Sequence, residues 1–179
     1  MLYTQTNDAA ANAVVAYTDE FGQLGPFPTG GRGSGEPHLP SQGSVVVAEG
    51  RLFVTNAGSG ELSVFDLDDM LLVATVPTGG SRPVSVAAAV GRAFVLNGGA
   101  EPSIGEIAFD EWALASVRPL PAGSDPAQVA LSPDHRMLVV TQRGTNSISL
   151  LPLDGGAPVS FRRPGLLRTG STSRATHSS

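Results

Sequence analysis

The sequence predicts an all-β chain in which a unit of four antiparallel strands recurs. Three stretches of one pattern, Arg51–Asn56, Arg92–Asn97 and Arg136–Thr141, begin 41 and 44 residues apart at positions 51, 92 and 136. Each alternates apolar with small or polar residues, and the first is followed by a Gly-containing hairpin turn, Ala57–Gly60. The 22 Gly and 14 Pro punctuate the chain too often for long helices, while 41% hydrophobic residues exclude disorder. A repeat of about 40–45 residues that contains four antiparallel strands is the signature of a β-propeller blade.

The first unit, residues 2–31, is predicted as a partial blade. Its strands are LYTQTN, AVVAYTD and QLGPFPT, with a turn at residues 8–11 between the first two. A loop dense in Gly and Pro follows from Gly30 to Gln42. Such loops cradle phosphate when they precede a helix N-terminus, but no helix is predicted here. The glycines are therefore expected to let an irregular crossover pass between blades.

Three further blades are predicted over residues 41–79, 83–123 and 126–161, the last of them nearly complete. Their strands are SVVVA, LFVTN, ELSVFDL and LLVATVPT, then VSVAAAV, AFVLN, SIGEIAF and ASVRPLPA, then AQVALS, MLVVTQ, SISLLPL and APVSF. The innermost strands are rich in small side chains, which suits the crowded region near a propeller axis. A β-sandwich of short strands is the alternative, and the regular period disfavours it because Greek-key connections produce no sequence repeat.

The repeat stops after Phe161. Residues 162–179 carry four Arg, no acidic residue and no alternation. We expect either a disordered tail or a shifted reading frame that ends a longer propeller early, and the abrupt break favours the second. Residues 1–161 would then form a partial propeller, about half of a seven-bladed ring.

Four segments together resemble one family, the seven-bladed lactonases related to 6-phosphogluconolactonase and carboxymuconate cyclase. The segments are GGRGSGEPHLPSQGSVVVA, LFVTNAGSGELSVFDL, PTGGSRPVSVA and DPAQVALSPDHRMLVVTQRGTNSISLLPLD, and the likeness covers residues 2–160. The resemblance implies a parent about twice this length, whose N-terminal partial blade is completed by a C-terminal strand. It also implies a histidine, a carboxylate and arginines at the central channel. About three blades of that parent are absent from this chain.

Candidate site residues cluster in the loops that enter the innermost strands. Opening a lactone requires a base that activates water and a cationic or hydrogen-bonding group for the carbonyl oxygen. We assign His38 as the candidate base and Arg82 as a catalytic or anion-binding partner. The candidate substrate-binding residues are Glu36, Gln42, Asp125 and Gln128.

Structural roles remain open for each of these residues. His38 lies between Pro37 and Pro40 and would also suit an exposed loop. Arg82 would also suit a role in holding its loop to a neighbouring blade, and Asp125 a role as a turn opener that caps its own loop.

Composition excludes several other classes of function. The chain has no Cys, so disulfides and thiolate metal sites are absent, and no metal or cofactor is expected. The acidic cluster at Asp66, Asp68 and Asp69 lacks the spacing of a calcium loop and is predicted to be a solvated turn. A net charge of −5 argues against nucleic acid and anionic membranes as partners. With no signal peptide and no apolar run near the roughly 18 residues of a membrane span, a soluble chain, cytoplasmic by default, is expected.

Two functions follow as hypotheses. The first is a metal-independent lactonase-like enzyme that hydrolyses or forms a lactone of a sugar acid or carboxylated organic acid. The second is a non-catalytic propeller that binds a protein or a cell-envelope ligand. An open half-ring also exposes two blade faces, so self-association through those faces is expected, and the isolated chain is expected to be inactive.

Overall fold

The computed structural model describes residues 1–37 and 42–162. These residues form fifteen β-strands and no helix, so none of them belongs to a helix that could cross a membrane. The strands assemble into one three-stranded and three four-stranded antiparallel sheets, each in simple chain order. The predicted all-β class with four-stranded blades is confirmed.

We number the sheets as blades 1 to 4 in chain order. Blade 1 contains β1 (Leu2–Gln5), β2 (Ala13–Tyr17) and β3 (Gln23–Pro28). Blade 2 contains β4 (Val45–Ala48), β5 (Arg51–Asn56), β6 (Glu61–Asp66) and β7 (Leu72–Pro77). Blade 3 contains β8 (Pro83–Ala89), β9 (Arg92–Asn97), β10 (Ser103–Ala108) and β11 (Ala113–Pro119). Blade 4 contains β12 (Pro126–Leu131), β13 (Met137–Gln142), β14 (Ser147–Pro152) and β15 (Val159–Arg162).

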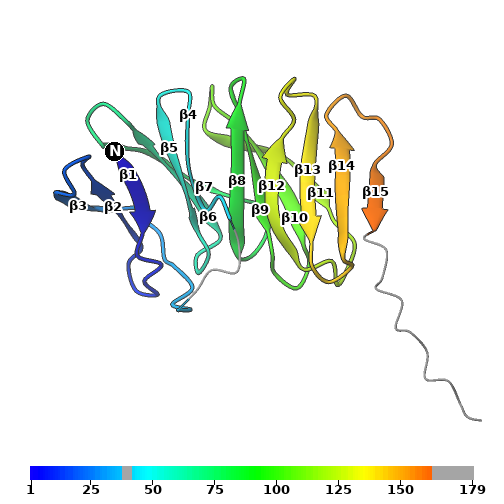
Figure 1. Cartoon of the computed structure of the whole chain (residues 1–179), viewed down its shortest axis with the longest axis horizontal. Coiled ribbons are helices and arrows are strands. Elements are labelled where there is room, and N and C mark those ends of the chain that lie inside the picture. Colours follow the sequence, from blue (N-terminus) through cyan, green and yellow to red (C-terminus); the bar gives the residue numbers. More distant parts are fainter. Residues whose placement is uncertain (38–41, 163–179) are drawn as a thin grey trace, which may run out of the picture.

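The blades stand side by side in chain order. Figure 1 shows this order, with blade 1 at one end and β15 at the other. The first strands of blades 2, 3 and 4 contact their neighbours, β4 against β8 and β8 against β12. These three strands are therefore the innermost ones, and the loops that enter them lie at one end of the blades.

Blade 1 lacks the innermost strand among the described residues. The register shows this, because Ala13 pairs with Pro28 just as Glu61 pairs with Pro77 and Ser103 pairs with Pro119. β2 and β3 thus correspond to the third and fourth strands of the other blades, and β1 to the second. The inner edge of β1 has no strand beside it in the same sheet.

An apolar cluster fills each space between neighbouring blades. Because side chains alternate across a strand, each blade has a front face toward the next blade and a back face toward the preceding one. The front face of blade 2 buries Leu62 and Val76 against Val86 and Val95 on the back face of blade 3. Equivalent clusters join blade 1 to blade 2 and blade 3 to blade 4. Each blade is therefore stabilised by its neighbours.

A buried polar contact accompanies the first two of these interfaces. The Thr29 hydroxyl donates to Asn56 Oδ1 over 2.8 Å, and the Thr78 hydroxyl donates to Asn97 Oδ1 over 2.7 Å. At the third interface, between blades 3 and 4, Leu120 stands at the position of Thr78. The Leu120 amide donates to the Pro102 carbonyl, just as the Thr78 amide donates to the Gly60 carbonyl. The polar contact is thus replaced by apolar packing between blades 3 and 4.

Strand ends differ from prediction where side chains compete for the backbone. β1 stops at Gln5 and not at Asn7, because Asn7 has a positive φ of 54° and its amide donates to Asn12 Oδ1 over 2.9 Å. β11 begins at Ala113, two residues before the predicted start at Ala115. It directly follows Trp112, whose ring stacks on Phe109 at a centroid distance of 4.9 Å. Of the predicted tail, residues 162–179, Arg162 ends β15, and residues 163–179 lie outside the described residues.

Candidate functional site

Arg82 and Asp125 occupy equivalent positions in neighbouring blades. Arg82 directly precedes β8 and Asp125 directly precedes β12, and both have left-handed φ values of 56° and 42°. Their carbonyl oxygens accept the amides of Gly98 and Arg143 at 2.9 and 3.0 Å. Each backbone is thereby held against the second strand of its own blade. This geometry places both side chains at the mouth, which is the end where the loops enter the innermost strands.

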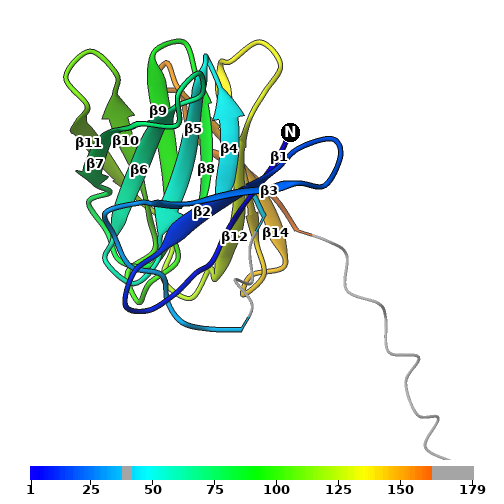
Figure 2. The same ribbon diagram turned by 90° about the vertical axis from the view of Figure 1, so that its left-hand side faces the viewer.

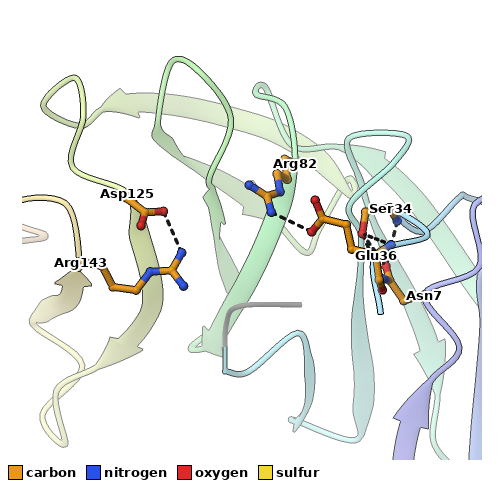
Figure 3. Close-up of polar contacts among 6 residues, drawn as sticks. All are labelled: Asn7, Ser34, Glu36, Arg82, Asp125 and Arg143. Carbon is orange, nitrogen blue, oxygen red and sulfur yellow. Dashed lines mark hydrogen bonds and ion pairs between the residues drawn. The ribbon is translucent and has the colours of Figure 1, made fainter. Parts of the chain in front are cut away.

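The loop that leaves blade 1 brings Glu36 to this mouth. Glu36 Oε2 lies 2.8 Å from the Arg82 guanidinium, although 46 residues separate the two in the chain. Figure 3 shows the Arg82 side chain directed at the Glu36 carboxylate. Two of the residues that sequence reasoning selected therefore form one ion pair.

Asn7 holds the loop that carries Glu36. Its side-chain amide donates to the Glu36 carbonyl at 2.9 Å and to Ser34 Oγ at 3.0 Å, and its Oδ1 accepts the Ser34 amide at 2.9 Å. The loop passes so close to blade 1 that a Cβ at Gly33 would overlap the backbone of Asn7. The glycines therefore serve a crossover, as predicted, and precede no helix among the described residues.

A second ion pair lies beside the first. Asp125 Oδ1 lies 2.8 Å from the Arg143 guanidinium, and Arg143 directly follows β13. Sequence reasoning missed Arg143. The signal was present, because the residues that follow the equivalent strands β5 and β9 are Ala57 and Gly98, so that Arg143 adds a charge at a repeat position that is otherwise small.

We call Glu36, Arg82, Asp125 and Arg143 the mouth cluster. In Figure 3 Arg82 lies between Glu36 and the Asp125–Arg143 pair, so acidic and basic groups alternate. All four side chains remain at least one-third exposed, and exposed ion pairs contribute only about 0–1 kcal/mol to folding. An arginine presents a planar fork of donors that fits a carboxylate or a phosphate. The cluster can thus exchange an internal carboxylate for an anionic group of a ligand.

The remaining selected residues lie in different places. Gln128 on β12 lines a depression of about 380 Å³ along the innermost strands β8 and β12, together with His135 of the following turn. Gln42 is exposed at the start of the described part of blade 2. His38 lies outside the described residues, so its position relative to the mouth cluster stays a prediction.

The described residues contain no group of three or more His, Asp or Glu that could hold a metal ion. In the predicted acidic turn, Asp66 pairs with Arg51 at 2.5 Å and accepts the Asp68 amide at 2.9 Å. Asp69 accepts the Leu71 amide at 3.0 Å. These carboxylates therefore cap a turn.

Solved structures place this arrangement in a known fold. The chain is similar to a streptogramin B lyase, with a TM-score of 0.64, 16% identity, and coverage of 90% of this chain and 51% of the lyase. It is similar to a candidate 6-phosphogluconolactonase from Bacteroides uniformis, with a TM-score of 0.59, 17% identity, and coverage of 89% and 51%. It is also similar to the dihydro-heme d1 dehydrogenase NirN, with a TM-score of 0.60, 17% identity, and coverage of 86% of this chain and 34% of NirN.

The fold is a partial β-propeller. The chain spans about half the length of the first two neighbours and about a third of NirN. At these identities the likeness shows the fold alone. No protein-family model and no curated protein sequence matches the chain.

Proposed function

We propose that this chain is part of a lactonase-like propeller that hydrolyses, or forms, a lactone of a sugar acid or carboxylated organic acid. The observation that carries the proposal is the Arg82–Glu36 pair at the channel mouth, with Arg143–Asp125 at the same level of the next blade. The structural likeness to the Bacteroides uniformis protein supports the choice of chemistry. The substrate binds where loops from several blades converge, which is the usual place for a propeller ligand.

The mouth cluster would act first as an anion site. A substrate carboxylate or phosphate takes two donors of the Arg82 guanidinium and replaces the Glu36 carboxylate there. Arg143 provides a second cation, held by Asp125. Binding in this way fixes the lactone ring above the innermost strands, where Gln128 lies.

Hydrolysis then needs a base and a proton donor. His38, which is assigned from the sequence, takes a proton from water while the water oxygen bonds to the lactone carbonyl carbon. The carbonyl oxygen becomes an oxyanion, which a guanidinium or amide donor stabilises. When the ring C–O bond breaks, the protonated base returns the proton to the leaving oxygen, and the product is a hydroxy acid.

Turnover of γ- and δ-lactones of sugar acids by the full-length parent, which completes the propeller, tests the proposal. Arg82→Ala and His38→Ala are each expected to lower kcat/KM at least tenfold. Arg92→Ala is the matched control, because Arg92 is similarly exposed and ion-paired, to Glu106 at 3.1 Å, but starts β9 at the opposite end of the blade. Activity that survives both Arg82→Ala and His38→Ala would overturn the site assignment.

The alternative function is a non-catalytic platform that binds a protein or a cell-envelope ligand. The same observation favours it, since each arginine of the mouth cluster already contacts an exposed carboxylate that an acidic ligand group can replace. Saturable binding of an acidic ligand that Arg82→Ala abolishes, without turnover of any lactone, would select this function.

A further inference from the structure

Within residues 1–37 and 42–162, the blades at the two ends of the row each have one face that no other blade covers, which we call an open face. The open front face belongs to blade 4 and consists of Val139, Thr141, Ile148, Leu150, Val159 and Phe161. The open back face belongs to blade 1 and consists of Leu2, Thr4, Val15 and Tyr17. Figure 2, which views the molecule from the blade 1 end, shows β1 to β3 nearest the viewer, with no other strand in front of them.

The open front face repeats a surface that the chain buries elsewhere. Ile148 pairs with Phe161 across β14 and β15 in the register in which Leu62 pairs with Val76 across β6 and β7. Leu62 and Val76 are 0% and 4% exposed because blade 3 covers them, whereas Ile148 and Phe161 are 46% and 57% exposed. A depression of about 480 Å³ lies beside these two side chains.

The open back face repeats the complementary surface. β1 corresponds to β5, so Leu2 stands at the position of Leu52 and Thr4 at that of Val54. β2 corresponds to β6, so Tyr17 stands at the position of Phe65. Leu52 is 0% exposed against blade 1, whereas Leu2 is 66% exposed.

Blade 1 is also incomplete at its inner edge. In the part of the chain that the structure describes, β1 has a neighbouring strand on one side only, so its other edge presents backbone groups that no strand of the sheet pairs. A strand supplied from outside the described residues would complete the sheet to the four strands of the other blades.

We propose that a second copy of this chain covers both open faces, front to back. The chain already forms this kind of interface three times, because the front face of each blade is complementary to the back face of the next. One open face of each kind lies on the same chain, so a second copy can continue the series. Such a front-to-back interface is heterologous, and it closes when the rotation between blades completes a circle. Two copies of four blades give eight, within the range of about four to eight blades seen in propellers.

Closure in this way would complete the channel. Each copy supplies one mouth cluster, so two clusters would face a shared channel at the same end of the ring. Assembly of the two copies would depend on the blade faces alone and not on lactone chemistry.

Sedimentation velocity of the full chain at micromolar concentration tests the proposal. The chain mass is 18.3 kDa, and a particle of twice this mass is expected. Ile148→Asp places a charge on the open front face and Leu2→Asp on the open back face, and each variant alone is expected to be a monomer. Leu71→Asp is the matched control, since Leu71 is 64% exposed in the β6–β7 turn and belongs to neither face.

Mixing the two monomeric variants provides the decisive step. A 1:1 mixture retains one unaltered front face and one unaltered back face, so it is expected to form a particle of two chains. Circular dichroism of each variant checks that its sheets are intact. A monomeric wild type, a mixture that stays monomeric, loss of assembly in only one variant, or particles larger than two chains would each overturn the proposal.

Discussion

At the scale of single residues, unusual backbone conformations place the polar groups. Arg82, Asp125 and His135 all have positive φ values, between 42° and 56°; Arg82 and Asp125 directly precede innermost strands, and His135 lies in the turn between β12 and β13. A positive φ turns the chain sharply and directs the side chain out of the sheet. For Arg82 and Asp125 the result is an ion pair at the mouth, each with a residue from another strand or loop.

Asp134 gives a prediction at this scale. The Ser132 hydroxyl donates to its carboxylate over 2.6 Å and the Arg136 amide over 3.2 Å, which lowers the pKa of Asp134 below its ordinary value of 3.8. Because the folded pKa is the lower one, the stability from this turn is complete above the unfolded pKa and is lost as pH falls through the folded pKa. Carbon-detected NMR titration should show the lowered pKa, and Ser132→Ala should raise it. An unchanged pKa in Ser132→Ala would contradict the assigned cause.

At the scale of strands and loops, the interblade Thr–Asn contact gives a second prediction. Thr78→Val keeps the shape of the side chain but removes the donor to Asn97 Oδ1, which is fully buried. A buried acceptor without a partner costs about 1–3 kcal/mol, so the free energy of unfolding should fall by that amount in denaturant titration. Ser116→Ala is the control, because Ser116 donates to Glu106 at an exposed site.

The control should change the free energy of unfolding by less than about 0.5 kcal/mol. Equal effects of Thr78→Val and Ser116→Ala would mean that the buried contact contributes no more to the free energy of unfolding than the exposed one. A variant that unfolds in more than one step would instead locate the weak point at the blade 2–blade 3 interface.

Local pattern explains how far the sequence could predict these elements. Alternation and Gly-containing turns are properties of neighbouring residues, so hairpins such as β5–β6 were predicted nearly to the residue. The Glu36–Arg82 pair could be suspected only from repeat alignment, because 46 residues separate its members. Arg143 was missed because its role appears only when its strand is stacked beside the loop of Asp125.

At the scale of the whole molecule, the repeat determines both what is stable and what is open. Each blade buries its front and back faces on neighbours, and the same geometry leaves one face uncovered at each end. The period in the sequence predicted the fold class and an uncovered blade face at each end of the row. It could not predict which anion the mouth cluster prefers, because that depends on loops whose side chains meet only in the stacked structure.

The most direct test of the central claim, that the mouth cluster is the ligand site, is an NMR titration of the ¹⁵N-labelled chain with 6-phosphogluconate, observing the arginine Nε–H signals. This open-chain sugar acid carries both a carboxylate and a phosphate. We predict saturable shifts for Arg82 and Arg143, and none for Arg51 and Arg92, whose ion pairs lie at the opposite end of the blades. Signals of Arg82 and Arg143 that stay unshifted, or shifts that are equal at all four arginines, would contradict the account.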